Sequence, residues 1–251
     1  MSTNPVPMEV EGGVATLRID RPEVHNAIDA QTASALEARL DQIEADKEIR
    51  VIVLTASGEQ TFCAGGDLKY FATLTDEKAV QAMSHRMQRL LDRFYRGHRV
   101  TVAAIAGNAY GGGCELLTAC HFRISVADAT FSFRQAANGI ITGWGGGLRL
   151  FRQLGRGPAL RLLLTAENCP AEEALRLGFI DQIVARENLM LETYALAAKI
   201  CSNDPRAVSA FLELSQEIYR SDTETFRERE TDLFAQCWAE GSFGDVLKRF
   251  T

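Results

Sequence analysis

The pattern of apolar and polar residues changes its period several times along the chain. Strict alternation on both sides of Gly12-Gly13 predicts a β-hairpin with a tight turn. Short continuous apolar runs predict buried strands, and apolar residues three or four positions apart predict amphipathic helices. Strands are therefore expected at 8–19 (the hairpin), 51–54, 101–106, 122–126, 130–133 and 179–184. Helices are expected at 30–45, 76–94, 148–154, 159–165 and 171–177.

The order of these elements indicates the fold class. Strands and helices alternate as far as about residue 185, which is typical of an α/β fold. From about residue 187 the pattern is helical to the end, with no flexible linker in between. We therefore expect a core at 1–186, which carries binding and catalysis, followed by a helical C-terminal region at 187–251.

The composition is that of an ordinary globular protein, with 251 residues of which 46% are hydrophobic and 24% charged. A net charge of −6 and the lack of a basic stripe argue against a nucleic-acid partner. The longest apolar stretches are too short to cross a membrane, and the start of the chain does not resemble a secretory signal. The six cysteines include no Cys-x-x-Cys pair, and no cluster has the spacing of metal ligands. We therefore expect a cytoplasmic protein with reduced cysteines and no metal.

A run of three glycines, at 111–113, separates the apolar run 101–106 from the apolar residues 116–120. Glycine at a junction between a strand and a helix lets a ligand approach the backbone closely. The first N–H groups of the helix are unpaired there, and they can stabilise a bound anion or a developing oxyanion. Glu115 lies in the first helical turn, within reach of the same ligand. The alternative interpretation is a tight turn with a glutamate that interacts favourably with the helix dipole.

A second loop of small residues, at 61–69, follows the predicted strand 51–54. Two such loops could each direct one backbone N–H at a shared oxygen, which is how an oxyanion hole is built from backbone alone. The glycines do not form a dinucleotide site, because no Gly-x-Gly-x-x-Gly follows the first strand with a ribose-binding acid beyond it. We therefore expect a site that stabilises negative charge on an oxygen of its ligand.

The two loops, together with the segments Arg21-Pro22-Glu23-Val24-His25-Asn26-Ala27-Ile28 and Leu177-Gly178-Phe179-Ile180-Asp181, resemble the crotonase superfamily, the enoyl-CoA hydratase/isomerase group. The resemblance covers nearly the whole chain. It implies a spiral of β-β-α repeats and a helical C-terminal region that mediates trimerisation. It also implies an acyl-CoA substrate, no cofactor other than the coenzyme A of that substrate, and a homotrimer or homohexamer.

The resemblance also assigns roles to individual residues. The oxyanion-hole donors fall on the backbone N–H groups of Ala64 and Gly112, and Glu115 matches the first of the two catalytic glutamates of the hydratases. The region that contacts coenzyme A comprises His25, Ala27, Gly65, Gly66, Asp67 and Leu68. The acyl pocket comprises Arg134, Ile141 and Trp144, although a tryptophan at this position could also belong to the core.

The second catalytic glutamate of the hydratases is replaced in this chain. In the hydratases it lies four residues before a glycine; here that glycine is Gly139, and the residue is Gln135. An amide can orient a water, a thioester or a carboxylate, but it does not carry a proton. Arg134 is a second difference, since a proline is common there in hydratases. This arginine could pair with a substrate carboxylate or could lie solvated at the edge of a strand.

The segment 138–146 is most similar to the ethylmalonyl-CoA decarboxylase-like branch of the superfamily, which lacks the second glutamate. This similarity slightly favours an acyl-CoA lyase that decarboxylates a malonyl-type CoA and stabilises the thioester enolate, with Glu115 as its one catalytic glutamate. Two alternatives stay open. One is an enoyl-CoA hydratase or double-bond isomerase that uses Glu115 alone, and the other is a non-catalytic subunit that binds CoA thioesters.

Overall fold

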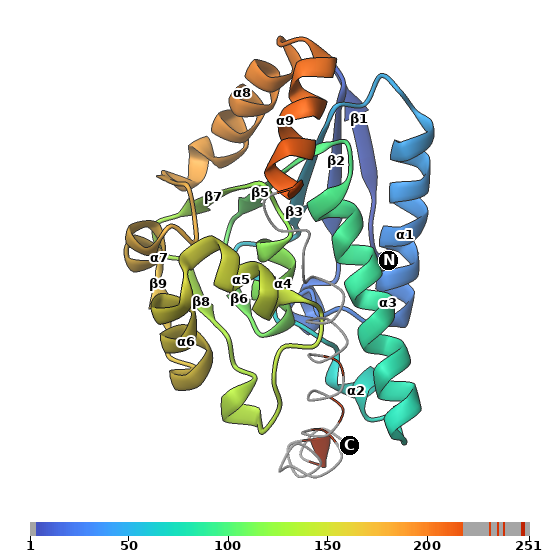
Figure 1. The fold of residues 1–251 in the computed structure, drawn as a ribbon, viewed down its shortest axis with the longest axis vertical. Helices are drawn as coiled ribbons and strands as arrows, with labels where there is room; N and C mark the ends of the chain where they lie inside the picture. The colour runs from blue at the N-terminus through green and yellow to red at the C-terminus, as the bar shows by residue number, and fades with distance from the viewer. Residues whose placement is uncertain (1–3, 218–230, 232–234, 236–237, 239–246, 249–251) are drawn as a thin grey trace.

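The computed structural model describes residues 4–217, 231, 235, 238 and 247–248 of the chain (Figure 1). Its strands are β1 Met8–Glu11, β2 Val14–Ile19, β3 Val51–Ala56, β4 Thr61–Cys63, β5 Val100–Ile105, β6 Asn108–Tyr110, β7 Phe122–Val126, β8 Thr130–Ser132, β9 Cys169–Pro170 and β10 Gln182–Val184. Its α-helices are α1 Ala30–Ala45, α2 Leu68–Phe71, α3 Glu77–Arg96, α4 Gly112–Thr118, α5 Gly146–Leu154, α6 Arg156–Thr165, α7 Ala171–Leu177, α8 Leu189–Cys201 and α9 Pro205–Glu217. Short 3-10 turns lie at Pro22–Val24, Ala136–Asn138 and Arg186–Asn188.

The strands form two sheets between which the chain passes repeatedly. One sheet has the order β1-β2-β3-β5-β7-β10, and it is parallel apart from the β1–β2 hairpin. The other has the order β4-β6-β8-β9, with β4, β6 and β8 parallel. A strand of the first sheet, a strand of the second and then a helix follow one another three times: β3-β4-α2, β5-β6-α4 and β7-β8-α5. This is the predicted spiral of β-β-α repeats.

The helices surround these sheets (Figure 1). Helices α1 and α3 pack against each other on one flank, and α5 and α6 pack against each other on the opposite flank. Helix α8 packs on β3, β5 and β7, so the start of the C-terminal region covers the six-stranded sheet. The central strand β5 is buried along its whole length, as expected for a parallel strand with both faces covered. Within the part of the chain that the structure describes, no helix is long and apolar enough to span a membrane.

Local signals account for most element boundaries. Helix α1 begins where predicted, because the Asp29 carboxylate accepts a hydrogen bond from Thr32 N at 2.7 Å. The predicted strand at 179–184 is shorter, at Gln182–Val184, and this correction has a local cause. The N–H groups of Phe179 and Ile180 both donate to the Ala174 carbonyl, so they complete the end of α7 instead of joining a sheet ladder. Residues 179 and 180 are nevertheless buried, which explains why their apolar pattern resembled a strand.

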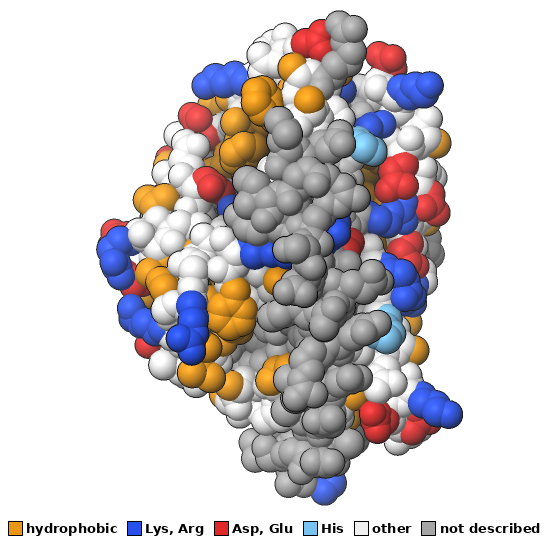
Figure 2. Space-filling model, in the orientation of Figure 1, with side chains coloured by type: hydrophobic (Ala, Val, Ile, Leu, Met, Phe, Trp, Pro, Cys, Tyr) orange, Lys and Arg blue, Asp and Glu red, His pale blue; other side chains and the backbone are white. Residues whose placement is uncertain are grey.

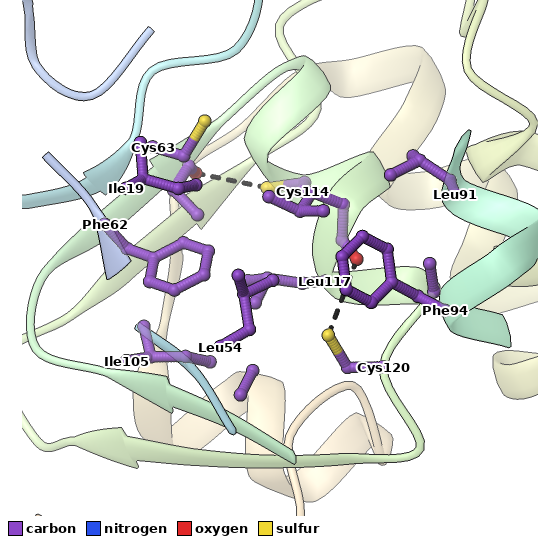
Figure 3. Packing of buried hydrophobic residues seen from close by; sticks show 14 of the residues in the cluster. Ile19, Leu54, Phe62, Cys63, Leu91, Phe94, Ile105, Cys114, Leu117 and Cys120 are labelled. Atoms are coloured by element: carbon purple, nitrogen blue, oxygen red, sulfur yellow. Dashed lines mark hydrogen bonds between the residues drawn. The ribbon is translucent and has the colours of Figure 1, made fainter. Parts of the chain in front are cut away.

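The core surrounds α4, the helix that follows the triple glycine (Figure 3). Leu117 lies among buried side chains from the strands and from α3, including Phe62 and Phe94. The Cys114 thiol donates to the Ala109 carbonyl, and burial raises its pKa well above the ordinary value. The described cysteines are all free. Helix α4 is therefore buried from Gly113 to Thr118, and this packing holds Glu115 in place.

Candidate active site

The two glycine-rich loops meet directly. Gly65, with φ of +98°, lies so close to the second loop that a Cβ atom would be 2.8 Å from Gly112 N and 2.9 Å from Tyr110 O. A Cβ on Gly113 would be 2.1 Å from Cys63 O. No larger residue fits either position without a backbone shift. The contact follows from the fold, because β4 and β6 are parallel neighbours and both loops leave from the same ends of their strands.

A cavity of about 390 Å³ opens where the loops meet. It brings together twelve of the thirteen residues predicted for the site, and Gly65 is the one that does not line it. The predicted residues in its wall are His25, Ala27, Ala64, Gly66, Asp67, Leu68, Gly112, Glu115, Arg134, Gln135, Ile141 and Trp144. The predicted residues therefore lie around one cavity, and their hydrogen bonds differ.

The predicted donor Ala64 is already engaged, and this is a correction. Its N–H donates to the His25 carbonyl at 3.0 Å, so it is not directed at a ligand. The next residues of the loop are fixed by Ile28, which donates to Gly65 O at 2.8 Å and accepts from Asp67 N at 2.9 Å. Gly66 N lies between these bonds and donates to no group among the described residues. The same holds for Gly112 N at the start of α4.

Glu115 is held by four N–H groups and is 2% exposed. Its Oε2 accepts from Trp144 N at 2.7 Å and from Gly146 N at 3.0 Å. Its Oε1 accepts from Gln135 Nε2 at 3.0 Å and from Gly143 N at 3.3 Å. The loop 143–146 thus wraps its backbone amides around one carboxylate, and Gly146 has no room for a side chain because a Cβ would lie 2.4 Å from Glu115 Cγ.

The pKa of Glu115 reflects two opposed influences. Burial raises its pKa above the ordinary value of 4.5, while the backbone amides of the loop and the nearby Arg149 guanidinium act in the opposite direction. All four close partners are donors, and a protonated carboxyl would turn its O–H against one of them. The four donors therefore fit an ionised carboxylate, while burial raises its pKa above that of an exposed glutamate.

Arg149, which the sequence reasoning did not single out, supports this loop from the interior. It is 3% exposed, and its Nη2 donates to the Trp144 carbonyl at 2.7 Å while its Nε donates to Thr118 Oγ1 at 3.0 Å. The guanidinium thus links the loop around Glu115 to the end of α4. Its signal in the sequence was weak, because it lies in the apolar, glycine-rich start of α5 and could have been taken for a surface residue.

The two ends of the Gln135 amide have different surroundings. Its Nε2 donates to the carboxylate, which fixes the orientation of the amide because an ionised carboxylate only accepts. Its Oε1 is buried and has no hydrogen-bond partner within the described part of the chain. A buried acceptor without a donor is costly, so this oxygen marks a position at which a donor belongs.

The turn at 25–28 is rigid for reasons that only the structure shows. Asn26 is buried with φ of +54°, and its Nδ2 donates to Ser57 O at 2.9 Å and to Thr61 O at 2.7 Å. Arg21 Nη2 lies 3.0 Å from the carboxylates of both Asp29 and Asp67. The Asp67 carboxylate therefore forms an ion pair within the protein. Of the residues predicted to contact coenzyme A, Asp67 is one whose side chain stabilises the loop itself.

The predicted acyl-pocket residues differ in character. Trp144 is buried and also lines the cavity, so it belongs to the core, and its role in an acyl pocket stays a prediction. Its ring covers Gly112, where a Cβ would lie 2.4 Å from Cζ3. Ile141 is half-buried and Arg134 is exposed at the cavity wall. Among the residues that the structure describes, no three His, Cys, Asp or Glu side chains come together in a way that could hold a metal ion.

With this geometry established, comparison with known proteins decides the family. The family model described as enoyl-CoA hydratase/isomerase matches residues 9–251. The chain belongs to the enoyl-CoA hydratase/isomerase family. It is therefore an enzyme of a family that acts on CoA thioesters, and the crotonase resemblance seen in the sequence is confirmed.

Individual relatives support the same assignment. The chain is 32% identical to the short-chain-enoyl-CoA hydratase of Clostridium acetobutylicum, over 100% of this chain and 95% of that protein. It is 32% identical to the crotonyl-CoA hydratase of Syntrophomonas wolfei, over 92% of this chain and 89% of that protein. A solved structure of an enoyl-CoA hydratase/isomerase from Xanthobacter autotrophicus has the same fold, with a TM-score of 0.91 at 23% identity over 98% of this chain and 93% of that one. None of these names is that of a decarboxylase.

The contact between Gly112 and Trp144 yields a first prediction. In Gly112→Ala the new methyl group would overlap the indole ring, so either the start of α4 or Trp144 must move. We expect turnover of a CoA-thioester substrate to fall by about a hundredfold, as when one oxyanion donor is lost. Gly157→Ala is the control, since its Cβ would meet no atom within 4 Å. Full activity in a folded Gly112→Ala protein would contradict the placement of the site.

Proposed function

We propose that this enzyme adds water reversibly across the double bond of an enoyl-CoA thioester, with Glu115 as its single acid–base residue. The observation that carries the proposal is the buried Gln135 Oε1, which finds no donor among the described residues and belongs to the amide that donates to the Glu115 carboxylate. A water that donates one hydrogen to this oxygen would satisfy it and would lie next to the Glu115 carboxylate, which could take the other proton of that water. The names of the relatives, which are hydratases, favour the same reaction.

The thioester oxygen would be bound by the N–H groups of Gly66 and Gly112. Both groups belong to the glycine loops at the cavity wall, and neither is used within the described part of the protein. Two preorganised donors at the carbonyl oxygen favour the enolate form of the thioester, in which negative charge collects there. Gly66 takes the place that the sequence assigned to Ala64.

The reaction can then proceed with one carboxylate. The water oxygen forms a bond to the β carbon as Glu115 takes one of its protons, and the electron pair of the double bond moves onto the thioester to give the enolate. Protonated Glu115 next gives that proton to the α carbon, and the enolate collapses to the 3-hydroxyacyl-CoA. The proton that leaves the water is the one that reaches the carbon, so Glu115 returns to its ionised state. Gln135 holds the water throughout and transfers no proton.

Decarboxylation, which the segment 138–146 favoured slightly, has weaker support. None of the relatives named above is a decarboxylase. The ionised Glu115 in the cavity wall would also repel the carboxylate that a malonyl-type substrate has to lose. Isomerisation of a double bond by Glu115 alone, and CoA-thioester binding without catalysis, are the other outcomes that an assay has to separate.

Substitution of Glu115 and of Gln135 tests the proposal. With crotonyl-CoA we expect Glu115→Gln to reduce kcat by about a thousandfold, since it removes the acid–base group. Gln135→Met, which keeps the length but not the acceptor, should reduce kcat by roughly tenfold. Because Glu115 must be ionised to accept a proton, kcat/KM should fall as the pH is lowered through its pKa, which burial raises above 4.5.

The control for Gln135→Met is Gln81→Met, since Gln81 is a half-buried glutamine of α3 that does not line the cavity. Products should be separated so that hydration of crotonyl-CoA, release of carbon dioxide from a malonyl-type CoA and isomerisation of a 3-enoyl-CoA are scored in parallel. Hydration by a Glu115→Gln protein at the wild-type rate would refute the mechanism. Decarboxylation without hydration would refute the proposed function.

We also propose that the enzyme is a homotrimer or homohexamer, as the family resemblance implied. The helices that begin the C-terminal region expose large apolar side chains, with Leu191 66% and Phe211 73% exposed. Hydrophobic side chains gather over α8 and α9 on the face drawn in Figure 2. Isolated apolar residues are common on surfaces, but a cluster of this kind is typical of an interface.

Light scattering at micromolar concentration tests this assembly. We expect the mass of three or six chains. The double variant Leu191→Ser, Phe211→Ser should give a smaller species, whereas Leu164→Ser, which alters an equally exposed leucine on α6, should not. A wild-type monomer would contradict the assembly.

A further inference from the structure

Two polar residues interrupt the apolar stripe of α3. Ser84 and Gln88 lie one helical turn apart, and both are buried among residues such as Met83, Met87 and Leu91. A buried polar side chain lowers stability unless it is fully hydrogen-bonded, so its presence in a core stripe calls for a physical reason. The partners of these two side chains supply it.

Both side chains bind one peptide group of the loop around Glu115, the group that joins residues 143 and 144, hereafter the 143–144 peptide. The carbonyl of this peptide accepts from Ser84 Oγ at 2.5 Å and from Gln88 Nε2 at 3.4 Å. The N–H of the same peptide donates to Glu115 Oε2 at 2.7 Å, the shortest of the four bonds to that carboxylate. One rigid planar unit therefore connects α3 to the carboxylate.

A residue of the C-terminal region completes the cluster. Gln88 Nε2 donates to Thr231 Oγ1 at 2.6 Å, and the Thr231 and Ser84 hydroxyl oxygens are 3.4 Å apart. Thr231 is 1% exposed. Since its oxygen accepts from Gln88, its hydroxyl hydrogen is available to Ser84, whose own hydrogen points at the peptide carbonyl. A directed chain of donors thus runs from Thr231 through Ser84 to the 143–144 peptide.

We infer that Ser84, Gln88 and Thr231 are positioning residues that act on Glu115 through the 143–144 peptide. The inference rests on the proposed function for its effect on rate, and on the observed bonds alone for its effect on the carboxylate. Hydrogen bonds to a peptide carbonyl polarise the peptide and strengthen the bond that its N–H donates. A stronger bond to the ionised carboxylate favours that ionised form. The cluster therefore tunes Glu115 without touching it or the substrate.

The inference gives the C-terminal region a part in the chemistry. Thr231 lies far beyond the core segment 1–186 that carries the glycine loops, yet only the Ser84 side chain and one peptide lie between its hydroxyl and the Glu115 carboxylate along these bonds. A change that displaces Thr231 should alter the acid–base behaviour of Glu115 even where the cavity is intact. This distinguishes the cluster from ordinary core packing.

The test compares variants that differ by one hydroxyl. Ser84→Ala removes the closest donor to the 143–144 peptide. Thr231→Val removes the hydroxyl with its branched shape kept, and Thr231→Ser keeps the hydroxyl. Ser125→Ala is the matched control, because Ser125 is equally buried and its hydroxyl donates to Val126 O at 3.0 Å on β7.

Two readouts are measured for each protein. The first is the pKa of Glu115, from infrared difference spectra against the same protein with Glu115→Gln. The second is the pH at which kcat/KM for crotonyl-CoA is half its maximum. We expect Ser84→Ala and Thr231→Val to raise both by roughly half to one pH unit, as expected when a hydrogen bond to the charged form weakens. Thr231→Ser and Ser125→Ala should leave both within the error of the wild type.

An unchanged pKa of Glu115 in Ser84→Ala and Thr231→Val overturns the inference, and so does an equal shift in Ser125→Ala. Should Thr231→Val fail to fold, the pair Ser84→Ala and Ser125→Ala decides. The infrared titration needs no turnover. If the wild type does not hydrate crotonyl-CoA but the pKa shifts occur, the proposed function fails and the positioning cluster stands.

Discussion

The carboxylate of Glu115 lies in the interior with four N–H groups directed at its two oxygens. Taking a carboxylate out of water is unfavourable by several kcal/mol unless donors replace the lost hydration. Here the loop 143–146 supplies three of them from its backbone. This arrangement requires glycine at 146, where a Cβ would meet the Glu115 side chain. The carbonyl groups of the loop point away from the carboxylate, and they need hydrogen-bond donors of their own. Arg149 holds the Trp144 carbonyl, and Ser84 of α3 holds the Gly143 carbonyl.

The spiral fold places this carboxylate close to the N–H groups that we propose as oxyanion donors. Parallel pairing of β4 with β6 brings the two glycine loops into contact, and α4 starts directly from the second loop. The N–H of Gly112 and the carboxylate of Glu115 therefore belong to the same first turn, with a separation set by helix geometry. A thioester oxygen bound at Gly112 would bring the α and β carbons of its acyl group toward Glu115. Binding and proton transfer are thus coupled by local backbone structure.

The sequence predicted much of this because the relevant signals are local. Asp29 caps α1 as expected, and two of the three glycines before Glu115 line the cavity together with that glutamate. It could not identify which amide of the first loop is free, since Ala64 is engaged by the carbonyl of His25, a residue from a distant turn. Phe179 was misassigned to a strand because burial and strand formation give the same apolar pattern. The role of Ser84 was hidden for a related reason, as its partner lies on another element.

In the proposed mechanism, one carboxylate moves the proton of the attacking water to the α carbon. Both new bonds must then form on the face of the double bond that Glu115 and Gln135 share, because a group fixed in the cavity wall cannot reach both faces. Hydration of crotonyl-CoA in D₂O, with the product resolved by NMR, tests this directly. We expect one deuterium at the α carbon, on the same face as the new hydroxyl. Addition to opposite faces, or an equal mixture of the two, would contradict it.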